Sequence, residues 1–299
     1  MPRSAVLLAV VALAGCEVNL NSEGIVSRET KRFEVTGIPE VQLETFDGAI
    51  EIHSWDRNEV EVEVERRAME QRLVDGMTIT AEQQGNRILV KVTAPGRGEG
   101  GFSGVQIGVH FSPSARLRVA MPRNSQLTAI TGDGAITIED VTGKMTLRTS
   151  DGSVRASRVG GEIVVRSGDG SIRIDRAEGS LDLETEDGSI TLNAKPTRLR
   201  ARTSDGSLRL EVGPDSVMTD DWDVQTGDGS VVVTLPSAFD GVLDAETRDG
   251  VVRVNHPALR ETERVGEDRD ERRRTLQATL GTGGRTFRIR TGDGSIRIE

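Results

Sequence analysis

The chain has 299 residues, of which 35% are hydrophobic, and its formal net charge at pH 7 is −10. This length and apolar content are sufficient for one long domain, or two short ones, with a buried core. The acidic balance argues against a nucleic-acid partner because the surface would repel phosphate overall, and the single cysteine excludes an intrachain disulfide.

The N-terminus has the pattern of a signal peptide. Its strongly apolar segment, residues 5–14, follows Arg3 and is too short to span a membrane. The segment ends in LAGC, residues 13–16, which resembles the lipobox of bacterial lipoproteins. The resemblance implies that residues 1–15 are a lipoprotein signal peptide and that Cys16 is lipidated, so that acyl chains hold the protein at a membrane. The alternatives are a secretory signal with an incidental cysteine, or a buried free thiol.

The residue after this cysteine bears on localisation. It is Glu17, whereas the inner-membrane retention signal of such lipoproteins usually has Asp there. We therefore expect a cell-envelope protein, lipid-anchored at the outer membrane or at an outward-facing membrane surface. Residues 16–31 are expected to be the lipidated cysteine and its tether.

Residues 32–121 predict a β-rich N-terminal cap. They contain alternating strand patterns, such as residues 59–65 and 87–92, and one copy of the later motif at residues 43–55. The segment RRAMEQRLVDG, residues 66–76, fits one short helix. A cap is required because a stack of repeats would otherwise expose apolar interior and unpaired strand edges to water.

Residues 122–299 carry a repeat built around an Asp-Gly pair. The pairs recur at intervals of 18 residues, and the last three follow gaps of 23, 21 and 44 residues. The aspartates are Asp133, Asp151, Asp169, Asp187, Asp205, Asp228, Asp249 and Asp293. A charged insertion, residues 260–274, interrupts the last gap and is interpreted as a solvated loop.

Each copy of the repeat predicts two strands. The positions six and four before the aspartate and three and five after it are apolar in every copy, for example Met145, Leu147, Val154 and Ala156 in the second. This alternation has the period of a β-strand with one buried face. The position four after the aspartate faces outward and is often basic: Thr137, Arg155, Arg173, Thr191, Arg209, Val232, Arg253 and Arg297.

Two architectures fit these strands. In an antiparallel meander each Asp-Gly pair closes a hairpin, but one apolar face of the long sheet stays uncovered. In a parallel β-solenoid each repeat is one rung, the two strand faces of a rung cover one another, and like residues stack about 4.8 Å apart. We therefore predict an all-β fold, a parallel β-solenoid of about eight 18-residue-type rungs with the β-rich cap. The closing nonapeptide, residues 291–299, is predicted to be the last rung.

The aspartates are interpreted as structural residues of the turn. Calcium-binding β-rolls need G-G-x-G-x-D on both turns, whereas each copy here supplies one carboxylate and no second liganding oxygen at fixed spacing. The aspartates are expected to accept local backbone hydrogen bonds, and the glycines to adopt the positive φ of a turn. The hydroxyl residues two positions before each aspartate predict a ladder at the corner. No metal or other cofactor is predicted.

The outward arginines are the candidate ligand-binding residues. Arg155, Arg173, Arg209, Arg253 and Arg297 form a candidate face for an anionic ligand, such as an envelope glycan or lipopolysaccharide, because guanidinium binds phosphate and carboxylate in a planar fork. The alternative is that acidic residues two positions on neutralise them. These acids are Asp175, Glu211 and Glu299.

No catalytic site is predicted. Parallel β-helix polysaccharide lyases and hydrolases need carboxylates in different environments at one break in the repeat, and the rungs here are nearly uniform. The three histidines, His53, His110 and His256, are scattered and show no metal-binding spacing. The sequence therefore favours a protein that is not an enzyme.

The repeated phrases carry a family resemblance. The segments LRTSDGSVRAS, VRSGDGSIRID, ARTSDGSLRLE and IRTGDGSIRIE, after LETFDGAIEIHSWD, resemble the DUF4097 adhesin family of bacterial β-strand-repeat proteins over about residues 33–299. The resemblance implies a β-helical envelope protein of unestablished biochemistry. The functional hypothesis is a non-catalytic, adhesin-like binding or scaffold role; a β-helix carbohydrate-active enzyme and a self-assembling envelope scaffold are the alternatives. The expected partners are the membrane, through the lipid anchor, and an envelope glycan or protein; the oligomeric state stays open.

Overall fold

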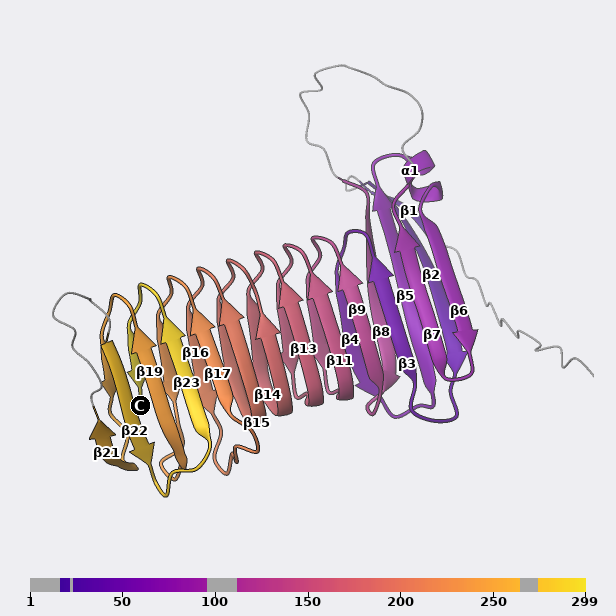
Figure 1. Cartoon of the computed structure of the whole chain (residues 1–299). Coiled ribbons are helices and arrows are strands. Elements are labelled where there is room, and N and C mark those ends of the chain that lie inside the picture. Colours follow the sequence, from indigo (N-terminus) through magenta and orange to yellow (C-terminus); the bar gives the residue numbers. More distant parts are fainter. Residues whose placement is uncertain (1–16, 22–23, 96–111, 264–273) are drawn as a thin grey trace, which may run out of the picture.

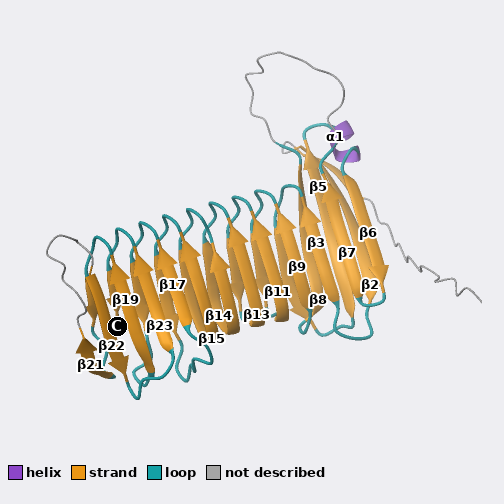
Figure 2. Ribbon diagram, viewed as in Figure 1, coloured by secondary structure: helices purple, strands orange, loops and turns teal. Residues whose placement is uncertain are grey.

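The computed structural model describes residues 17–21, 24–95, 112–263 and 274–299. The predicted all-β class is confirmed: the described residues form 24 strands and one short helix, α1 (Gln71–Asp75), with both parallel and antiparallel pairing. Figure 2 shows the strands side by side along an elongated body, with the helix at one end. The predicted signal peptide and Cys16 lie outside the described residues. No helix within them has the length and apolar character needed to cross a membrane.

Most of the body is a stack of parallel layers, each with one strand on either flank. We call the flank made by the strands before the Asp-Gly turns flank A. In spatial order it contains β9 (Gln126–Thr131), β11 (Thr142–Thr149), β13 (Gly160–Ser167), the second halves of β14 (Ile172–Glu184) and β15 (Ile190–Thr203), β17 (Trp222–Thr226), β23 (Thr286–Thr291) and β19 (Gly241–Thr247).

The strands after the turns form flank B. In the same order these are β10 (Ile136–Glu139), β12 (Val154–Ser157), the first halves of β14 and β15, β16 (Leu208–Val212), β18 (Val231–Thr234), β24 (Ile296–Ile298) and β20 (Val252–Val254). Val154 lies opposite Ile172, one repeat later, in a parallel ladder. A meander requires antiparallel pairs between consecutive copies, so this pairing excludes it.

The last copy of the repeat is not the last layer. β23 pairs in parallel with β17 on one side and with β19 on the other, and β24 lies likewise between β18 and β20. In Figure 1 the yellow β23 lies between the orange β17 and β19. The predicted position of residues 291–299 at the end of the stack is therefore wrong. The chain leaves one layer open after β18 and returns to fill it, which the 44-residue gap permits.

The predicted N-terminal cap supplies two further layers. β3 (Glu40–Thr45) and β4 (Ile50–Trp55), which flank Asp47, pair in parallel with β9 and β10. β7 (Arg87–Thr93) and β8 (Ser114–Pro122) pair in parallel with β3 and β4. The Asp-Gly copies of residues 122–299 form eight layers. With the two layers from the predicted cap, the described part of the stack has ten parallel layers, more than the predicted eight rungs.

Antiparallel strands close both ends of the stack. β5 (Glu59–Ala68), β2 (Gly24–Glu34) and β1 (Glu17–Asn21) extend flank B beyond β8, and β6 (Thr78–Gln84) extends flank A beyond β7. At the other end, β22 (Arg274–Leu280) and β21 (Leu259–Glu263) extend flank A beyond β19.

These end strands correct two boundaries. Residues 24–31, which the sequence placed in a tether, belong to β2, where regular pairing with β5 satisfies their backbone groups. Of the predicted solvated loop, residues 260–263 lie in β21 and Arg274 begins β22. Residues 264–273 lie outside the described residues.

The core lies between the two flanks. All predicted inward positions are buried except Val252 and Val254. Both belong to β20, the outermost layer of flank B, where no further strand covers them from that side within the described residues. The largest buried side chains are grouped near the C-terminal layers, where Trp222 contacts Phe239 and Phe287.

Candidate functional site

The Asp-Gly turns form one long edge of the stack, and hydroxyl groups connect its layers. Thr149 Oγ1 donates to the carbonyl oxygens of Gly132 (2.8 Å) and Gly134 (3.0 Å) in the preceding layer. Thr226 makes the same bond to Gly206 (2.7 Å). The hydroxyl ladder that the sequence predicts is present, and it satisfies carbonyl groups that would otherwise be buried without partners.

The glycines of these turns have a different role from the predicted one. Of the Asp-Gly glycines only Gly48 has a positive φ, 125°. The others are required because the layers approach closely: a Cβ at Gly152 would lie 1.9 Å from the carbonyl oxygen of Gly134. Positive φ occurs instead at glycines of the opposite turn, such as Gly143 (131°). The prediction assigned the right residue for the wrong physical reason.

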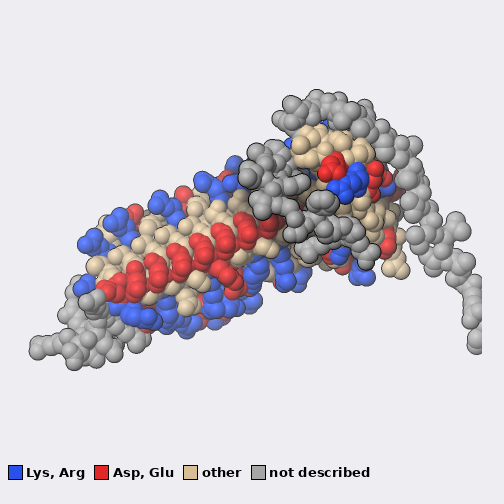
Figure 3. Space-filling model, turned by 90° about the horizontal axis from the view of Figure 1, so that it is seen from above, with Lys and Arg blue, Asp and Glu red and all other residues tan. Residues whose placement is uncertain are grey.

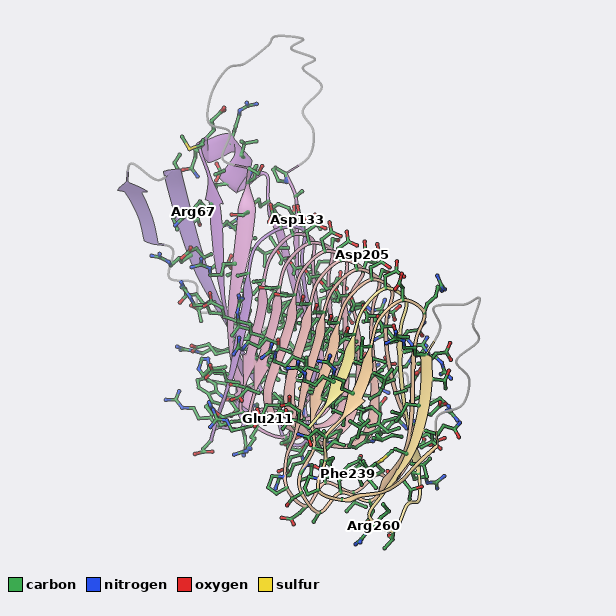
Figure 4. The ribbon with its side chains drawn as sticks, turned by 90° about the vertical axis from the view of Figure 1, so that its left-hand side faces the viewer. Arg67, Asp133, Asp205, Glu211, Phe239 and Arg260 are labelled. Carbon is green, nitrogen blue, oxygen red and sulfur yellow. The ribbon has the colours of Figure 1, made fainter. Side chains whose placement is uncertain are left out.

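The turn edge carries a ladder of carboxylates. Register places the aspartates of neighbouring layers side by side, about 4.8 Å apart per layer. Figure 3 shows the ladder as a continuous red stripe, and Figure 4 shows Asp133 and Asp205 on this edge. Asp47 belongs to it too; partial burial, and then the negative charge of Asp133, raise the pKa of Asp47. In spatial order the ladder is Asp47, Asp133, Asp151, Asp169, Asp187, Asp205, Asp228, Asp293 and Asp249.

Where the structure describes them, neither this ladder nor the histidines form a metal centre. Within the described residues, no group of three or more His, Cys, Asp or Glu side chains is arranged to hold a metal ion. His53 is exposed, and His110 lies outside the described residues. His256 is buried: its Nδ1 accepts from the Ala258 N–H, and its Nε2 lies 3.0 Å from the Pro236 carbonyl. His256 therefore has a structural role at a corner.

The predicted arginines lie in one row on flank B, but not in sequence order. Arg155 and Arg173 occupy adjacent layers, Arg209 stands alone, and Arg297 precedes Arg253 at the C-terminal end. The row reads Arg155, Arg173, Thr191, Arg209, Val232, Arg297 and Arg253, which is six steps, or about 29 Å. We call these seven residues the arginine row; its five arginines are all exposed.

The acids two positions along the strands neutralise little of this row. Asp175 pairs with Arg176 at 2.8 Å, rather than with Arg173. Only Arg297 pairs with the acid of its own strand, Glu299, at 3.8 Å. Among the described residues, Arg173, Arg209 and Arg253 form no ion pair. The charge-pairing alternative therefore accounts for one arginine of the five.

Charges on flank A are arranged differently. One of its outward rows alternates in sign across five layers, in the register Asp182, Arg200, Asp223, Arg288 and Asp244. Several of the charged side chains on flank A form ion pairs with side chains of a neighbouring layer.

Ion pairs on flank A show the effect of this alternation. Arg166 lies 2.9 Å from Asp182 and 3.1 Å from Glu184, and Arg290 lies 3.4 Å from Asp244. On flank A, arginines are thus neutralised by acidic side chains of neighbouring layers, whereas the arginine row on flank B contains no acidic residue.

Flank B is also neutralised at its N-terminal end. Arg118 on β8 lies 2.7 Å from Glu63 and 3.4 Å from Glu51. The neighbouring Glu65 is only 5% exposed. Burial would raise the pKa of Glu65, but a 2.8 Å hydrogen bond from Arg28 and the surrounding positive charges bring it below its usual range. Uncompensated positive charge on flank B therefore begins at β12.

A row of serines, which the sequence reasoning missed, separates the arginine row from the carboxylate ladder. It occupies the position two after six of the nine aspartates, and Ser153 Oγ accepts a 2.6 Å hydrogen bond from Arg155. Its signal was visible as the recurring D-G-S phrase. Together the rows offer guanidinium donors beside hydroxyl groups on flank B. The serines are Ser153, Ser171, Ser189, Ser207, Ser230 and Ser295.

Comparisons with known proteins identify the kind of chain. The family model described as Toastrack DUF4097 matches residues 38–299. Comparison with curated proteins finds no matching sequence.

Solved structures were also compared. Similarity to a "putative adhesin" from Bacteroides fragilis covers 91% of this chain and 97% of the other, at 9% identity and a TM-score of 0.37. Similarity to a "putative adhesin" from Parabacteroides distasonis covers 91% of this chain and 97% of the other, at 12% identity and a TM-score of 0.39. Similarity to a "putative lipid binding protein" from the same species covers 91% of this chain and 96% of the other, at 11% identity and a TM-score of 0.37.

Proposed function

We propose that this chain, which belongs to the Toastrack DUF4097 family, is a non-catalytic binding protein of the cell envelope that holds an anionic ligand on flank B of a parallel β-solenoid. One observation carries the proposal. The arginine row has a single sign of charge, and four of its five arginines have no ion-pair partner among the described residues, whereas an outward row of flank A alternates in sign. An anion that binds these four arginines does not have to displace a carboxylate partner, so its charge-assisted hydrogen bonds add to affinity.

Binding to envelope material tests this proposal. The triple variant Arg173→Gln/Arg209→Gln/Arg253→Gln is compared with Arg148→Gln/Arg200→Gln/Arg288→Gln, which removes the same charge from flank A. Cosedimentation with envelope fractions is expected to fall for the flank B variant and to persist for the flank A variant. Equal loss in both would mean that net charge alone drives binding. Binding that both variants retain would remove flank B as the site.

We also propose that the protein is a lipoprotein. The apolar residues 5–14 and the LAGC sequence that ends at Cys16 support lipidation of this cysteine, and Glu17 supports placement at the outer membrane or at an outward-facing surface. Detergent phase partitioning tests the anchor. The wild-type chain is expected in the detergent phase and Cys16→Ser in the aqueous phase. Equal partitioning of the two would exclude lipidation of Cys16.

A further inference from the structure

The arginine row has a regular spacing across the layers. Arg173, Arg209 and Arg297 are separated by two layers each, with Thr191 and Val232 between them, which gives a repeat of about 10 Å. Arg155 and Arg253 extend the row by one layer at either end. The pattern is therefore symmetric about Arg209. A ligand that engages Arg173, Arg209 and Arg297 together must be long and must carry charges at this interval.

The surroundings of the row confine an anion to a narrow line. The carboxylate ladder runs parallel to it beyond the serine row, and it repels any anion that spreads in that direction. On the other side, Glu211 lies two residues beyond Arg209 on the same strand and Glu299 two beyond Arg297. Figure 4 shows Glu211 on the flank, away from the turn edge that carries Asp133 and Asp205. Attraction is therefore strongest along the row and falls off to either side.

We infer that the ligand of this flank is a linear acidic polysaccharide that lies along the arginine row, across the strands, with carboxylates on alternate sugars. This inference rests on the proposed function and specifies its ligand. An extended chain of β-linked sugars advances by roughly one interstrand distance per ring, so alternate carboxylates fall opposite Arg173, Arg209 and Arg297. The serine hydroxyls beside the row can exchange hydrogen bonds with sugar hydroxyls.

Other anions fit the flank less well. A free phosphate or a single uronic acid contacts one or two guanidinium groups and gains nothing from the length of the row. An anionic membrane presents a plane of charge, which would meet the carboxylate ladder as well as the arginines. A linear polymer is the ligand that can follow the row without approaching the ladder.

Oligosaccharides of defined length test the inference. Hyaluronan fragments, which carry a carboxylate on every second sugar, are titrated into the full mature chain by calorimetry. Affinity is expected to rise steeply from the disaccharide to the hexasaccharide, and to level off once the ligand exceeds the length of the row. Polygalacturonate, with a carboxylate on every sugar, is expected to bind less tightly per charge because its carboxylates opposite Thr191 and Val232 meet no arginine.

Single substitutions supply matched controls. Arg209→Gln, at the centre of the row, is expected to weaken binding about tenfold, the effect of losing one charge-assisted contact. Glu211→Gln, on the same strand, is expected to strengthen binding two- to threefold by removing the nearest repulsive charge. Arg200→Gln on flank A removes an exposed charge of the same kind and is expected to change affinity by less than about twofold.

Three outcomes would overturn the inference. The first is affinity independent of chain length, and the second is affinity unchanged in Arg209→Gln. The third is Arg209-dependent binding to vesicles of anionic phospholipid without any binding of the oligosaccharides. Any of these outcomes leaves the proposed function in place if cosedimentation with envelope fractions still depends on the arginines of flank B. If the flank A and flank B variants lose binding equally in that cosedimentation assay, both the proposed function and the polysaccharide inference are removed.

Discussion

Trp222 and Phe287 pack edge to face, with ring centroids 5.3 Å apart and an interplanar angle of 78°. They occupy the same inward column, Trp222 on β17 and Phe287 on β23, and are register partners in a parallel ladder. Had the layers followed the sequence, Leu243 would lie between them. The contact therefore shows that the layer formed by the last copy of the repeat is inserted between the β17/β18 layer and the β19/β20 layer.

The first prediction concerns this contact. Phe287→Ala removes a fully buried ring and leaves a cavity against Trp222, so it is expected to lower the free energy of unfolding by about 3–5 kcal/mol. Urea denaturation followed by Trp fluorescence measures the change. Ile38→Ala, at a side chain that is 54% exposed, is the control and is expected to have little effect. A loss below about 1 kcal/mol for Phe287→Ala would contradict the packing described.

A second prediction separates close approach from backbone conformation at the turns. Gly152→Ala places a Cβ 1.9 Å from the Gly134 carbonyl oxygen, so the layers must move apart, at a cost of about 3 kcal/mol. Gly160→Ala is the control, because its Cβ would meet nothing closer than 3.5 Å and its φ is not in the left-handed region. Thermal unfolding of both variants checks the difference. Equal melting temperatures would show that crowding does not select glycine at residue 152.

The hydroxyl ladder gives a third prediction. Thr149→Val keeps the shape of the side chain but removes the donor to Gly132 and Gly134, and is expected to cost about 1–3 kcal/mol. Thr149→Ser should retain most of the stability, since Ser167 occupies the same column and bonds to the Gly152 carbonyl at 3.1 Å. Chemical denaturation compares the variants. If Val and Ser were equally tolerated, the hydroxyl would have no role in joining the layers.

The fourth prediction is a pH dependence at Asp47. Its pKa is raised in the folded chain, so the native state holds this proton at a higher pH than the unfolded chain does. Stability is therefore expected to fall as the pH rises from the ordinary Asp range through the raised pKa. Above that window Asp47→Asn should be more stable than the wild type, and the difference should vanish at lower pH.

Denaturation at a series of pH values checks this fourth prediction. Asp133→Asn removes the nearest negative charge and should lower the pKa of Asp47, which narrows the window. An advantage of Asp47→Asn that was largest in acid would have the wrong sign and would contradict the electrostatic account.

Sequence could predict which residues face inward but not the order of the layers. The inward columns follow from the two-residue period of a strand, and nearly all of them are buried. Layer order depends on which copy lies beside which, and every copy presents the same kind of aliphatic side chains to its neighbours. The repeat motif gives β19 and β23 the same pattern of inward apolar residues, so it does not indicate which of the two strands lies beside β17. For the same reason the copy at Asp47 was assigned to a cap, although it stacks on the copy at Asp133.

The candidate site was predictable in its members but not in its arrangement. The outward position four after the aspartate identifies Arg173 and Arg209 from sequence alone. Whether an acid neutralises them depends on side-chain direction, and Asp175 pairs with Arg176, which lies at a positive φ of 54°. The adjacency of Arg297 and Arg253 follows from the layer insertion, which a local pattern does not contain.

The inserted layer also sets an order of events in the life of the chain. Among the described residues, strands β19 and β20 find their parallel partners only in β23 and β24, which follow them in the chain. The preceding layers can assemble progressively from the N-terminus as the chain emerges. The layer of β19 and β20 cannot reach its final place until β23 and β24 have formed, so a chain that lacks β23 and β24 has two unfinished faces instead of a shorter intact stack.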